Sequence, residues 1–214
     1  MKPFLLVLSS PSGGGKTSIA KRLLATRADL GYSISATTRA RRPNETDGAD
    51  YHFLSAEEFA RREAADLFLE SATYSEHRYG TLRSEIDRVL AGGKHAVLDV
   101  ELEGARQIRR RFPDAVQVFV LPPSGRELTA RLTGRKTEST EALRRRLEHA
   151  AVEFGAVTEY DYVVINEHLE QAVGAVSAII DAETLRVRRQ DGLMVLAEQL
   201  RREVLAAAAK LGQD

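Results

Sequence analysis

Short apolar runs alternate with segments of helical spacing along most of this chain. We expect the runs to be strands in the interior of the protein. They lie at residues 4–8, 95–100, 115–121 and 162–166. Apolar residues with helical spacing lie between the runs, for example at 16–27 and 104–111. Because strands joined by helices are typical of βαβ units, the pattern predicts an α/β fold built on a parallel sheet.

The pattern changes between about residues 33 and 83, where short strand-like segments are separated by polar turns. These segments lie at 32–38, 51–54 and 68–74. Ser55 and Glu58 form a capping box, which predicts the start of a short helix. The change from alternating strands and helices to a strand-rich pattern indicates a small lobe inserted into the core.

A second capping box, Ser124 with Glu127, opens a basic segment that Gly134 interrupts, as expected for a hinged helical lid. We therefore expect a core with two insertions. The predicted parts are core at 1–32, the strand-rich lobe at 33–83, core at 84–125, the lid at 126–148, and core with C-terminal helices at 149–214.

The tail from about Thr184 is amphipathic, and its apolar positions are Leu193, Leu196, Leu200 and Leu205. We expect this tail to pack on the body as a terminal helix. A helix that docks on a partner or on a second copy is the alternative.

The residues after the first apolar run predict a phosphate-binding loop. Glycines allow backbone N–H groups to turn inward around an anion, and the next helix directs its positive end to the same place. We expect Lys16 to add a charge between the β- and γ-phosphates and the Thr17 hydroxyl to bind Mg²⁺. The predicted ATP-binding residues of the loop are Ser12, Gly13, Gly14, Gly15, Lys16, Thr17 and Ser18.

The loop departs from the pattern G-x-x-x-x-G-K-[ST] in one position, because Ser10 replaces the first glycine. The part that contacts the phosphates, Gly15-Lys16-Thr17, is intact. A chance glycine-rich turn is the alternative interpretation, but the strand before the loop and the helix after it favour the phosphate loop.

Composition narrows the function classes. The 214 residues include 31 basic and 31 acidic residues, so the formal net charge is +0 and does not point to a nucleic acid or a membrane. The chain contains no cysteine, which excludes disulfides and thiolate metal sites. Because no apolar stretch has the length of a signal peptide core or a membrane span, we expect a cytoplasmic protein. We expect it to be a monomer or a homodimer.

A second anion site would distinguish a kinase from other triphosphate-binding proteins. Arg39 and Arg42 lie three residues apart in a polar turn, and an arginine fork suits a phosphate group. Tyr51 and Tyr79 could each donate a hydroxyl to the same group. Taken alone, these arginines fit a solvated basic turn better than a phosphate site.

These motifs, in this order, resemble the guanylate kinase family of P-loop nucleoside monophosphate kinases. The resemblance covers about residues 4–182 and rests on the motifs at 33–39, 42–43, 47–51, 67–70, 79–81, 97–101, 134–138 and 160–166. It implies a P-loop NTP hydrolase-like core with an inserted GMP-binding lobe and a helical lid. It also implies transfer of the ATP γ-phosphoryl group to GMP, and to dGMP, with Mg²⁺, in purine nucleotide metabolism.

The resemblance also implies roles for individual residues. Five would hold the GMP phosphate: Ser35, Arg39, Arg42, Tyr51 and Tyr79. Three would read the guanine: Glu70, Thr81 and Asp99. The lid arginines would close over the transferring group: Arg131, Arg135 and Arg146. Asn166 would lie near the adenine, and Lys16 and Arg39 would act in catalysis with the lid arginines.

The chemistry of guanine agrees with these roles. Guanine presents two adjacent N–H donors, and the carboxylate of Glu70 can accept both, whereas adenine offers neither. Two departures from the family pattern concern the metal and the hinge. Glu101 stands where aspartate is common, and its longer side chain would reach Mg²⁺ through a water molecule. Lys136 replaces a lid glycine, which predicts a stiffer hinge. We expect Glu148 and Glu153 to be surface charges.

Two other functions fit parts of the sequence. The first is a guanylate-kinase-like scaffold that binds protein ligands, against which the intact loop and the lid arginines argue. The second is a kinase of the same fold whose acceptor is a phosphorylated sugar, against which Glu70 and Thr81 argue.

Overall fold

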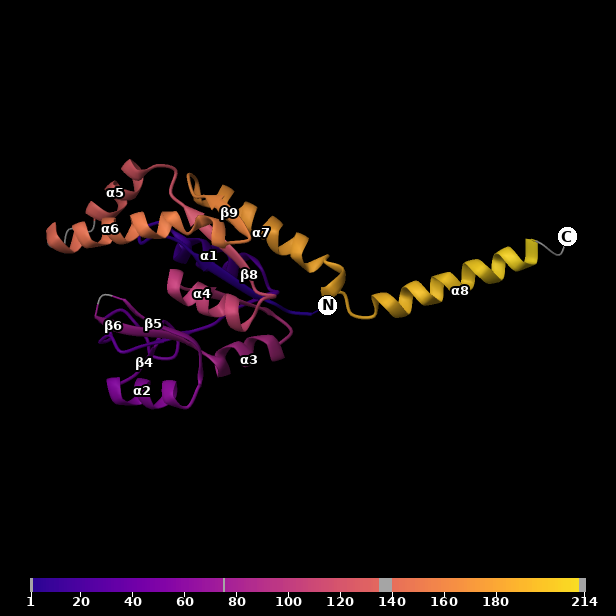
Figure 1. Cartoon of the computed structure of the whole chain (residues 1–214), viewed down its shortest axis with the longest axis horizontal. Coiled ribbons are helices and arrows are strands. Elements are labelled where there is room, and N and C mark those ends of the chain that lie inside the picture. Colours follow the sequence, from indigo (N-terminus) through magenta and orange to yellow (C-terminus); the bar gives the residue numbers. More distant parts are fainter. Residues whose placement is uncertain (1, 75, 135–139, 212–214) are drawn as a thin grey trace.

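Five parallel strands form the central sheet of the computed structural model, which describes residues 2–74, 76–134 and 140–211. The order across the sheet is β2-β7-β1-β8-β9 (Figure 1). The strands are β1 (Leu5–Ser9), β2 (Leu30–Tyr32), β7 (His95–Asp99), β8 (Val116–Leu121) and β9 (Tyr162–Ile165). The α/β fold with a parallel sheet that the sequence predicts is therefore confirmed.

Alternate residues of the central strands enter opposite cores, because successive side chains of a strand point to opposite faces. Leu6 and Leu8 pack with α1 (Lys16–Thr26) and α7 (Leu169–Thr184). Leu5 and Val7 pack with α3 (Arg83–Ala91) and α4 (Leu102–Arg111). Both faces are covered, which explains why these strands are apolar runs rather than alternating sequences.

A second sheet of four strands lies beside the core, with the order β4-β3-β6-β5. Its strands are β3 (Ser35–Thr37), β4 (His52–Phe53), β5 (Phe68–Tyr74) and β6 (His77–Leu82). Helix α2 (Ala56–Ala64) buries Phe59 against Ala36, Phe68 and Leu82. This helix begins as predicted, because the backbone N–H of Glu58 donates to the Ser55 hydroxyl at 3.1 Å.

The segment 32–38, which we predicted as a single strand-like unit, is divided between the two sheets. Tyr32 ends β2 in the central sheet, and Ser35 begins β3 in the second sheet. Between them the N–H of Ser33 donates to the carbonyl of Val97, and the N–H of Ile34 donates to the carboxylate of Glu85. The two intervening residues thus carry the chain out of the core and into the lobe.

Two helices, α5 (Gly125–Thr133) and α6 (Thr140–Gly155), occupy the segment predicted to be a lid. They pack through Leu128, Leu132 and Ala150, and the Ser124 hydroxyl caps α5 by accepting the N–H of Glu127. Residues 135–139 lie outside the described residues. The predictions for Arg135 and for a stiffer hinge at Lys136 are therefore not tested.

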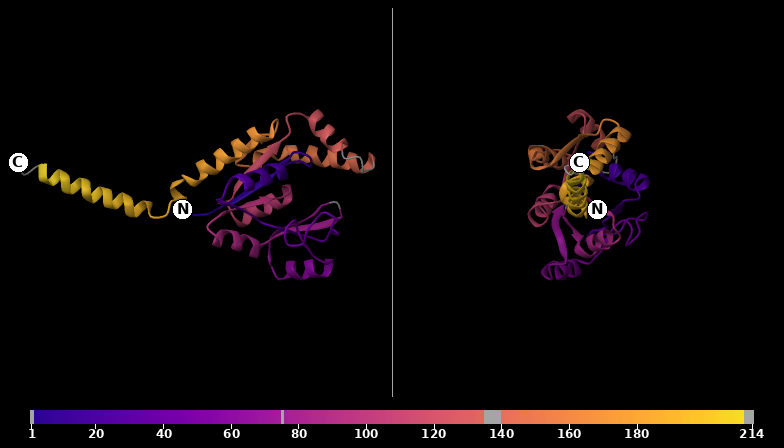
Figure 2. Two further views of the ribbon diagram at one scale, coloured as in Figure 1. Left: turned by 180° about the vertical axis from the view of Figure 1, so that it is seen from behind. Right: turned by 90° about the vertical axis from the view of Figure 1, so that its right-hand side faces the viewer.

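The C-terminal helix α8 (Leu193–Leu211) projects away from the body instead of packing on it (Figures 1 and 2). None of its residues is buried, so the prediction of a packed terminal helix is wrong. Both faces of the central sheet are already covered, by α1 and α7 on one side and by α3 and α4 on the other, so no sheet face is left for α8 to cover. The last buried residue of the described chain is Arg189, which donates to the carbonyl of Asp114 and to Glu183.

Short connections join the last elements of the chain. Two 3-10 turns, Val157–Glu159 and Val187–Arg189, connect helices to their neighbours. Asp191 and the following Gly192, whose φ is 74°, lie between the second turn and α8. In the described part of the chain, no helix is both long enough and apolar enough to cross a bilayer.

Candidate active site

The glycine-rich loop joins β1 to α1 and has the backbone geometry of an anion site. Gly13 and Gly15 have φ angles of 86° and 100°, which side chains other than glycine rarely adopt. Gly15 is the residue that caps α1, so the positive end of the helix faces the loop. Both glycines are therefore required by the backbone, and the loop is suited to phosphate.

Ser10, the departure from the loop pattern, is buried and fits without strain. It is not among the residues with positive φ in the described chain. Its side chain occupies space that Gly14 leaves open, because a Cβ at Gly14 would lie 2.8 Å from the Ser10 Cβ. The hydroxyl of Ser10 donates to the carbonyl of Pro11 at 3.0 Å. The serine therefore leaves the phosphate-facing end of the loop unchanged.

Lys16 and Thr17 are both held by carboxylates at the ends of neighbouring elements. The Lys16 ammonium lies 2.7 Å from Glu101 Oε1 and 3.7 Å from Asp99 Oδ1, and the Thr17 hydroxyl donates to Asp99 at 2.6 Å. Burial lowers the pKa of Lys16, but the charges of Glu101 and Asp99 outweigh it and raise that pKa above its ordinary value. Burial raises the pKa of Asp99, which Lys16 and Thr17 partly offset.

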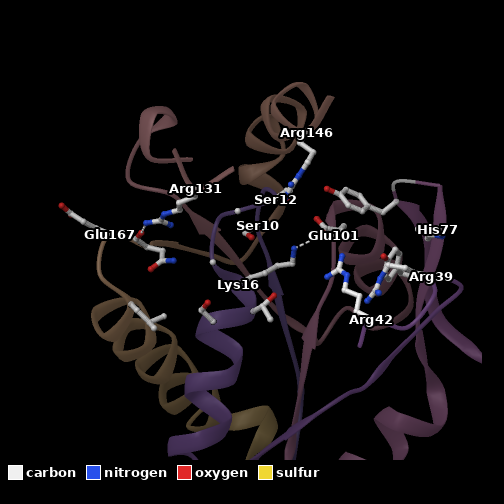
Figure 3. Close-up of a pocket in the computed structure, with 18 residues that line it drawn as sticks. Ser10, Ser12, Lys16, Arg39, Arg42, His77, Glu101, Arg131, Arg146 and Glu167 are labelled. Carbon is white, nitrogen blue, oxygen red and sulfur yellow. Dashed lines mark hydrogen bonds and ion pairs between the residues drawn. The ribbon is translucent and has the colours of Figure 1, made fainter. Parts of the chain in front are cut away.

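The loop faces a cavity of about 880 Å³ that the lobe and the lid also line. Arg39 and Arg42 reach it from the lobe, on the side of Lys16 opposite to Arg131 (Figure 3). Residues predicted to bind ATP line it as well: Ser12, Gly13, Gly15, Lys16, Thr17, Ser18 and Asn166. The fold thus brings the two predicted anion sites to one cavity, which is the arrangement that phosphoryl transfer requires.

Arg39 is held in place by a residue that the sequence analysis missed. Both terminal nitrogens of Arg39 bind the carboxylate of Glu45, at 2.7 and 3.0 Å. The same carboxylate accepts the backbone N–H of Arg42 at 2.9 Å, so Glu45 fixes the turn that carries both arginines. The Arg39 guanidinium also lies over the Tyr51 ring, 5.5 Å from its centroid. Hydrogen bonding to Glu45 raises the pKa of Arg39.

A smaller pocket of about 190 Å³ continues from Lys16 and Thr17 into the lobe. Its lining includes five of the residues predicted to bind GMP: Ser35, Tyr51, Glu70, Tyr79 and Asp99. A sixth, Thr81, lies behind the lining, and its hydroxyl donates to Glu70 at 2.7 Å. The remaining two GMP-binding candidates, Arg39 and Arg42, line the larger cavity. The eight candidates are therefore distributed over two connected spaces.

Glu70 is a buried carboxylate with only 5% of its surface exposed. Burial raises the pKa of Glu70 to about 7, although hydrogen bonds from Thr81 act in the opposite direction. The backbone of α4 lies directly behind the carboxylate, because a Cβ at Gly104 would be 2.6 Å from Glu70 Oε2. The carboxylate therefore sits between Thr81 and a helix surface without a side chain.

The lid contributes arginines to the loop side of the large cavity. Arg146 donates to the Ser12 hydroxyl at 2.6 Å, and Arg131 donates to the carbonyl of Asn166 at 3.2 Å. The side-chain amide of Asn166 in turn donates to the carbonyl of Gly14 at 2.9 Å. Arg146 and Asn166 thus brace the phosphate loop from two sides.

Glu153 corrects the prediction of a surface charge. Only 1% of this residue is exposed, and it lies on α6 seven positions after Arg146, which is two helical turns along the same face. The spacing from Arg146 could have indicated that Glu153 shares its face of the helix. The burial of Glu153, however, depends on the phosphate loop packing against α6. Glu148, in contrast, is exposed and binds Arg144 as expected of a surface charge.

The residues around Lys16 fit a divalent cation of the magnesium type. Among the described residues, no group of three or more acidic or histidine side chains could hold a metal by itself. However, Mg²⁺ normally takes one or two carboxylates together with substrate phosphates and water. The Thr17 hydroxyl and the Asp99 carboxylate are adjacent, and one buried oxygen of Glu101 has no hydrogen-bond partner in the described structure.

Comparison with known proteins agrees with this geometry. A family model described as guanylate kinase matches residues 2–183. The chain belongs to the guanylate kinase family. A guanylate kinase of Sphingopyxis alaskensis is 46% identical over 208 residues, which cover 97% of this chain and 94% of that protein. A guanylate kinase of Paramagnetospirillum magneticum is 44% identical over 92% of each chain.

The fold comparison gives the same result. The crystal structure of guanylate kinase from Anaplasma phagocytophilum superposes with a TM-score of 0.76 at 33% sequence identity, covering 92% of this chain and 95% of that one. The predicted family, fold class, enzyme class and guanylate kinase function are therefore confirmed. The roles of individual residues and the boundaries of the lobe and the lid stay predictions.

Proposed function

We propose that this member of the guanylate kinase family transfers the γ-phosphoryl group of ATP to the phosphate of GMP, with Mg²⁺, to give ADP and GDP. The observation that carries the proposal is the shared cavity, in which Lys16 faces Arg39 and Arg42. One anion site serves the donor and the other serves the acceptor. Direct transfer needs both phosphates in one water-excluded space.

The donor side would bind ATP through the loop. The backbone N–H groups around Gly13 and Gly15 would surround the phosphates, and Lys16 would leave Glu101 to contact them. Thr17 and Asp99 would hold the Mg²⁺, which supplies charge neutralisation at the phosphate oxygens. Asn166 would lie near the adenine and would also hold the phosphate loop in place, because its side-chain amide donates to the Gly14 carbonyl.

The acceptor side would bind GMP through its phosphate and its base. Arg39, Arg42 and the tyrosines would hold the phosphate at the mouth of the smaller pocket. Glu70 would accept the two adjacent N–H groups of guanine, and the Thr81 hydroxyl would turn from Glu70 to the guanine carbonyl. Adenine would leave the buried carboxylate without donors, a mismatch that can cost a factor of about 10⁴–10⁵ in discrimination.

The transfer itself would be driven by position and charge. The attacking oxygen of the GMP phosphate is already ionised, so no general base is required. Arg131 and Arg146 would neutralise the charge that spreads over the oxygens of the transferring group. Arg135, which is not among the described residues, would have the same role.

A coupled assay for ADP release tests this function. GMP, dGMP, AMP, CMP, UMP and ribose phosphates are supplied separately as acceptors with Mg²⁺ and ATP. We expect turnover with GMP and dGMP and at most a trace with the others. Turnover with a sugar phosphate but not with GMP would replace the acceptor assignment, and no turnover with any acceptor would support a scaffold that binds protein ligands.

A further inference from the structure

The strand that carries Glu70 has an open edge and an irregular backbone. β5 is the outer strand of the second sheet, so among the described strands only β6 pairs with it. This pairing is itself interrupted, because the register between the two strands shifts between Phe68 and Glu70. A shift of this kind bends a strand and changes the direction of the side chains beside it. The pairing with β6 therefore supports the backbone at Glu70 from one side only.

Helix α4 takes the place of a partner strand at the open edge of β5. The side-chain amide of Gln107 accepts the N–H of Ser71 at 3.1 Å and donates to the carbonyl of the same residue at 2.8 Å. One turn further along α4, a terminal nitrogen of Arg111 donates to the carbonyls of the two residues that precede Glu70, at 2.8 and 3.0 Å. Two side chains of the core thus bind the backbone immediately before and immediately after Glu70.

The positions of α4 that meet this segment form one stripe along the helix. Gly104, Gln107 and Arg111 are spaced by three and four residues, which places them on the same face. Gly104 leaves room for the carboxylate of Glu70, whereas the two longer side chains reach the backbone of β5. The stripe is therefore fitted to the segment that carries Glu70.

We propose that Gln107 and Arg111 are positioning residues of the acceptor site, which complete the open edge of β5 and hold Glu70 where its carboxylate can accept both adjacent N–H groups of guanine. This inference rests on the proposed function, in which Glu70 reads the base. A carboxylate that accepts two hydrogen bonds must be in line with both donors, so it depends more on its direction than an acceptor of one bond does. Both residues would act through Glu70, which lines the smaller pocket.

Calorimetry without ATP tests the inference with two ligands, GMP and inosine monophosphate (IMP). IMP keeps the N1–H of the base but lacks the exocyclic amino group, so it offers Glu70 one donor instead of two. The quantity of interest is the ratio of the dissociation constant for IMP to that for GMP. Gln107→Met keeps the bulk of the side chain and removes both hydrogen bonds to Ser71. We expect this variant to lower the ratio about three- to tenfold, because one of the two bonds to guanine is weakened.

Two further variants complete the test. Arg111→Met removes the other contact with β5 and should lower the ratio by a smaller factor, about two- to threefold, because Arg111 is partly exposed to water. Its result decides the question if Gln107→Met folds poorly. Arg109→Ala is the matched control, because Arg109 is also on α4 but binds Asp161 instead of β5. It should leave the ratio unchanged.

A double variant separates positioning from packing. In a Glu70→Gln background the carboxylate is absent, so a residue that acts through it has little left to position. We therefore expect Gln107→Met to change the ratio less than about twofold in this background. A residue that only stabilises the lobe would have the same effect in both backgrounds.

Three results would overturn the inference. The first is an unchanged ratio in Gln107→Met, including the case in which GMP and IMP are weakened equally. The second is an equal fall of the ratio in Arg109→Ala, and the third is an equal fall in the Glu70→Gln background. Failure of the proposed function looks different, because the wild-type protein itself would then show no preference for GMP over IMP or no turnover with GMP.

Discussion

On both the donor and the acceptor side of the cavity a carboxylate binds a basic side chain, Glu101 binding Lys16 and Glu45 binding Arg39. The two sides differ in whether backbone or side chains form the site. On the donor side the backbone defines the site, through the left-handed glycines at 13 and 15 and the start of α1. On the acceptor side, pairs of side chains define it, with Glu45 holding Arg39 and Thr81 holding Glu70. Among the described residues, the small apolar core of the lobe that carries the acceptor side consists of four buried residues.

This difference has a consequence for mutation. A site made from main-chain N–H groups depends on few side chains, so most substitutions near it act only through packing. A site made from side-chain pairs depends on each partner, so its affinity can be changed in small steps. The four predictions below test the comparison, from the largest expected effect to the smallest.

Lys16→Ala tests the charged side chain of the phosphate loop on the donor side. We expect turnover to fall about 10²- to 10³-fold, because a charge directed at the transferring phosphates is lost. The coupled ADP assay measures the effect, and thermal unfolding should confirm that the variant is folded. Lys21→Ala, an exposed lysine on the same helix, is the control and should be unaffected. Near-normal turnover of Lys16→Ala would remove this residue from the mechanism.

Glu70→Gln tests the base-reading role on the acceptor side. The amide can accept only one of the two guanine donors and presents an N–H to the other, so we expect the KM for GMP to rise about 10- to 100-fold. The KM for ATP should change less than twofold. Steady-state kinetics with each substrate varied in turn measures both values. Equal losses for GMP and ATP would contradict the assignment.

The pH dependence of GMP binding tests the same carboxylate through its titration. Burial raises the pKa of Glu70 to about 7, and guanine is expected to bind the ionised form. GMP affinity should therefore be complete well above pH 7 and decrease as the pH falls, by about tenfold between pH 8 and pH 6.

The GMP phosphate also titrates in this range, with a pKa of about 6, so Glu70→Gln serves as the reference. Calorimetry of both proteins from pH 6 to pH 8 isolates the contribution of Glu70 as the difference between their slopes. Parallel slopes would show that Glu70 does not titrate in the binding equilibrium.

Glu45→Gln tests the support beneath Arg39 and should have the smallest effect. Without the paired carboxylate, Arg39 keeps its charge but loses its fixed orientation. We expect GMP binding to weaken about two- to fivefold, in the range of a partly exposed ion pair. Glu58→Gln is the control, because Glu58 pairs with Arg62 on α2 at the far side of the lobe core. An equal effect in both variants would mean that Glu45 only stabilises the lobe.

Local sequence patterns predicted the parts of the molecule that depend on neighbouring residues. The first strand, the glycine loop and the caps at Ser55 and Ser124 follow from turn chemistry and periodicity within a few residues, and the structure has them where they were expected. The Lys16 side of the site was therefore predictable. The acceptor side was predicted from the resemblance to the guanylate kinase family, because each of its motifs alone is too unspecific to identify a site.

The remaining features depend on contacts between distant segments. Glu153 was predicted to be a surface charge, yet it is buried and its carboxylate lies by the backbone of Ser12 in the phosphate loop. Glu45 looked like one more charge in a polar turn, and only the folded turn shows that it binds Arg39. The position of α8 could not be predicted, because its amphipathic pattern is equally compatible with packing and with exposure.

The bare backbone at Gly104 has a consequence for how base preference can change. A methyl group there would occupy the place of Glu70 Oε2 and push the carboxylate toward the ligand. If Glu70 reads the base as proposed, discrimination between bases would depend in part on the contour of α4, whose Gly104 lines the same pocket. A substitution at this single position would then change the acceptor preference while Glu70 and Thr81 themselves stay in place.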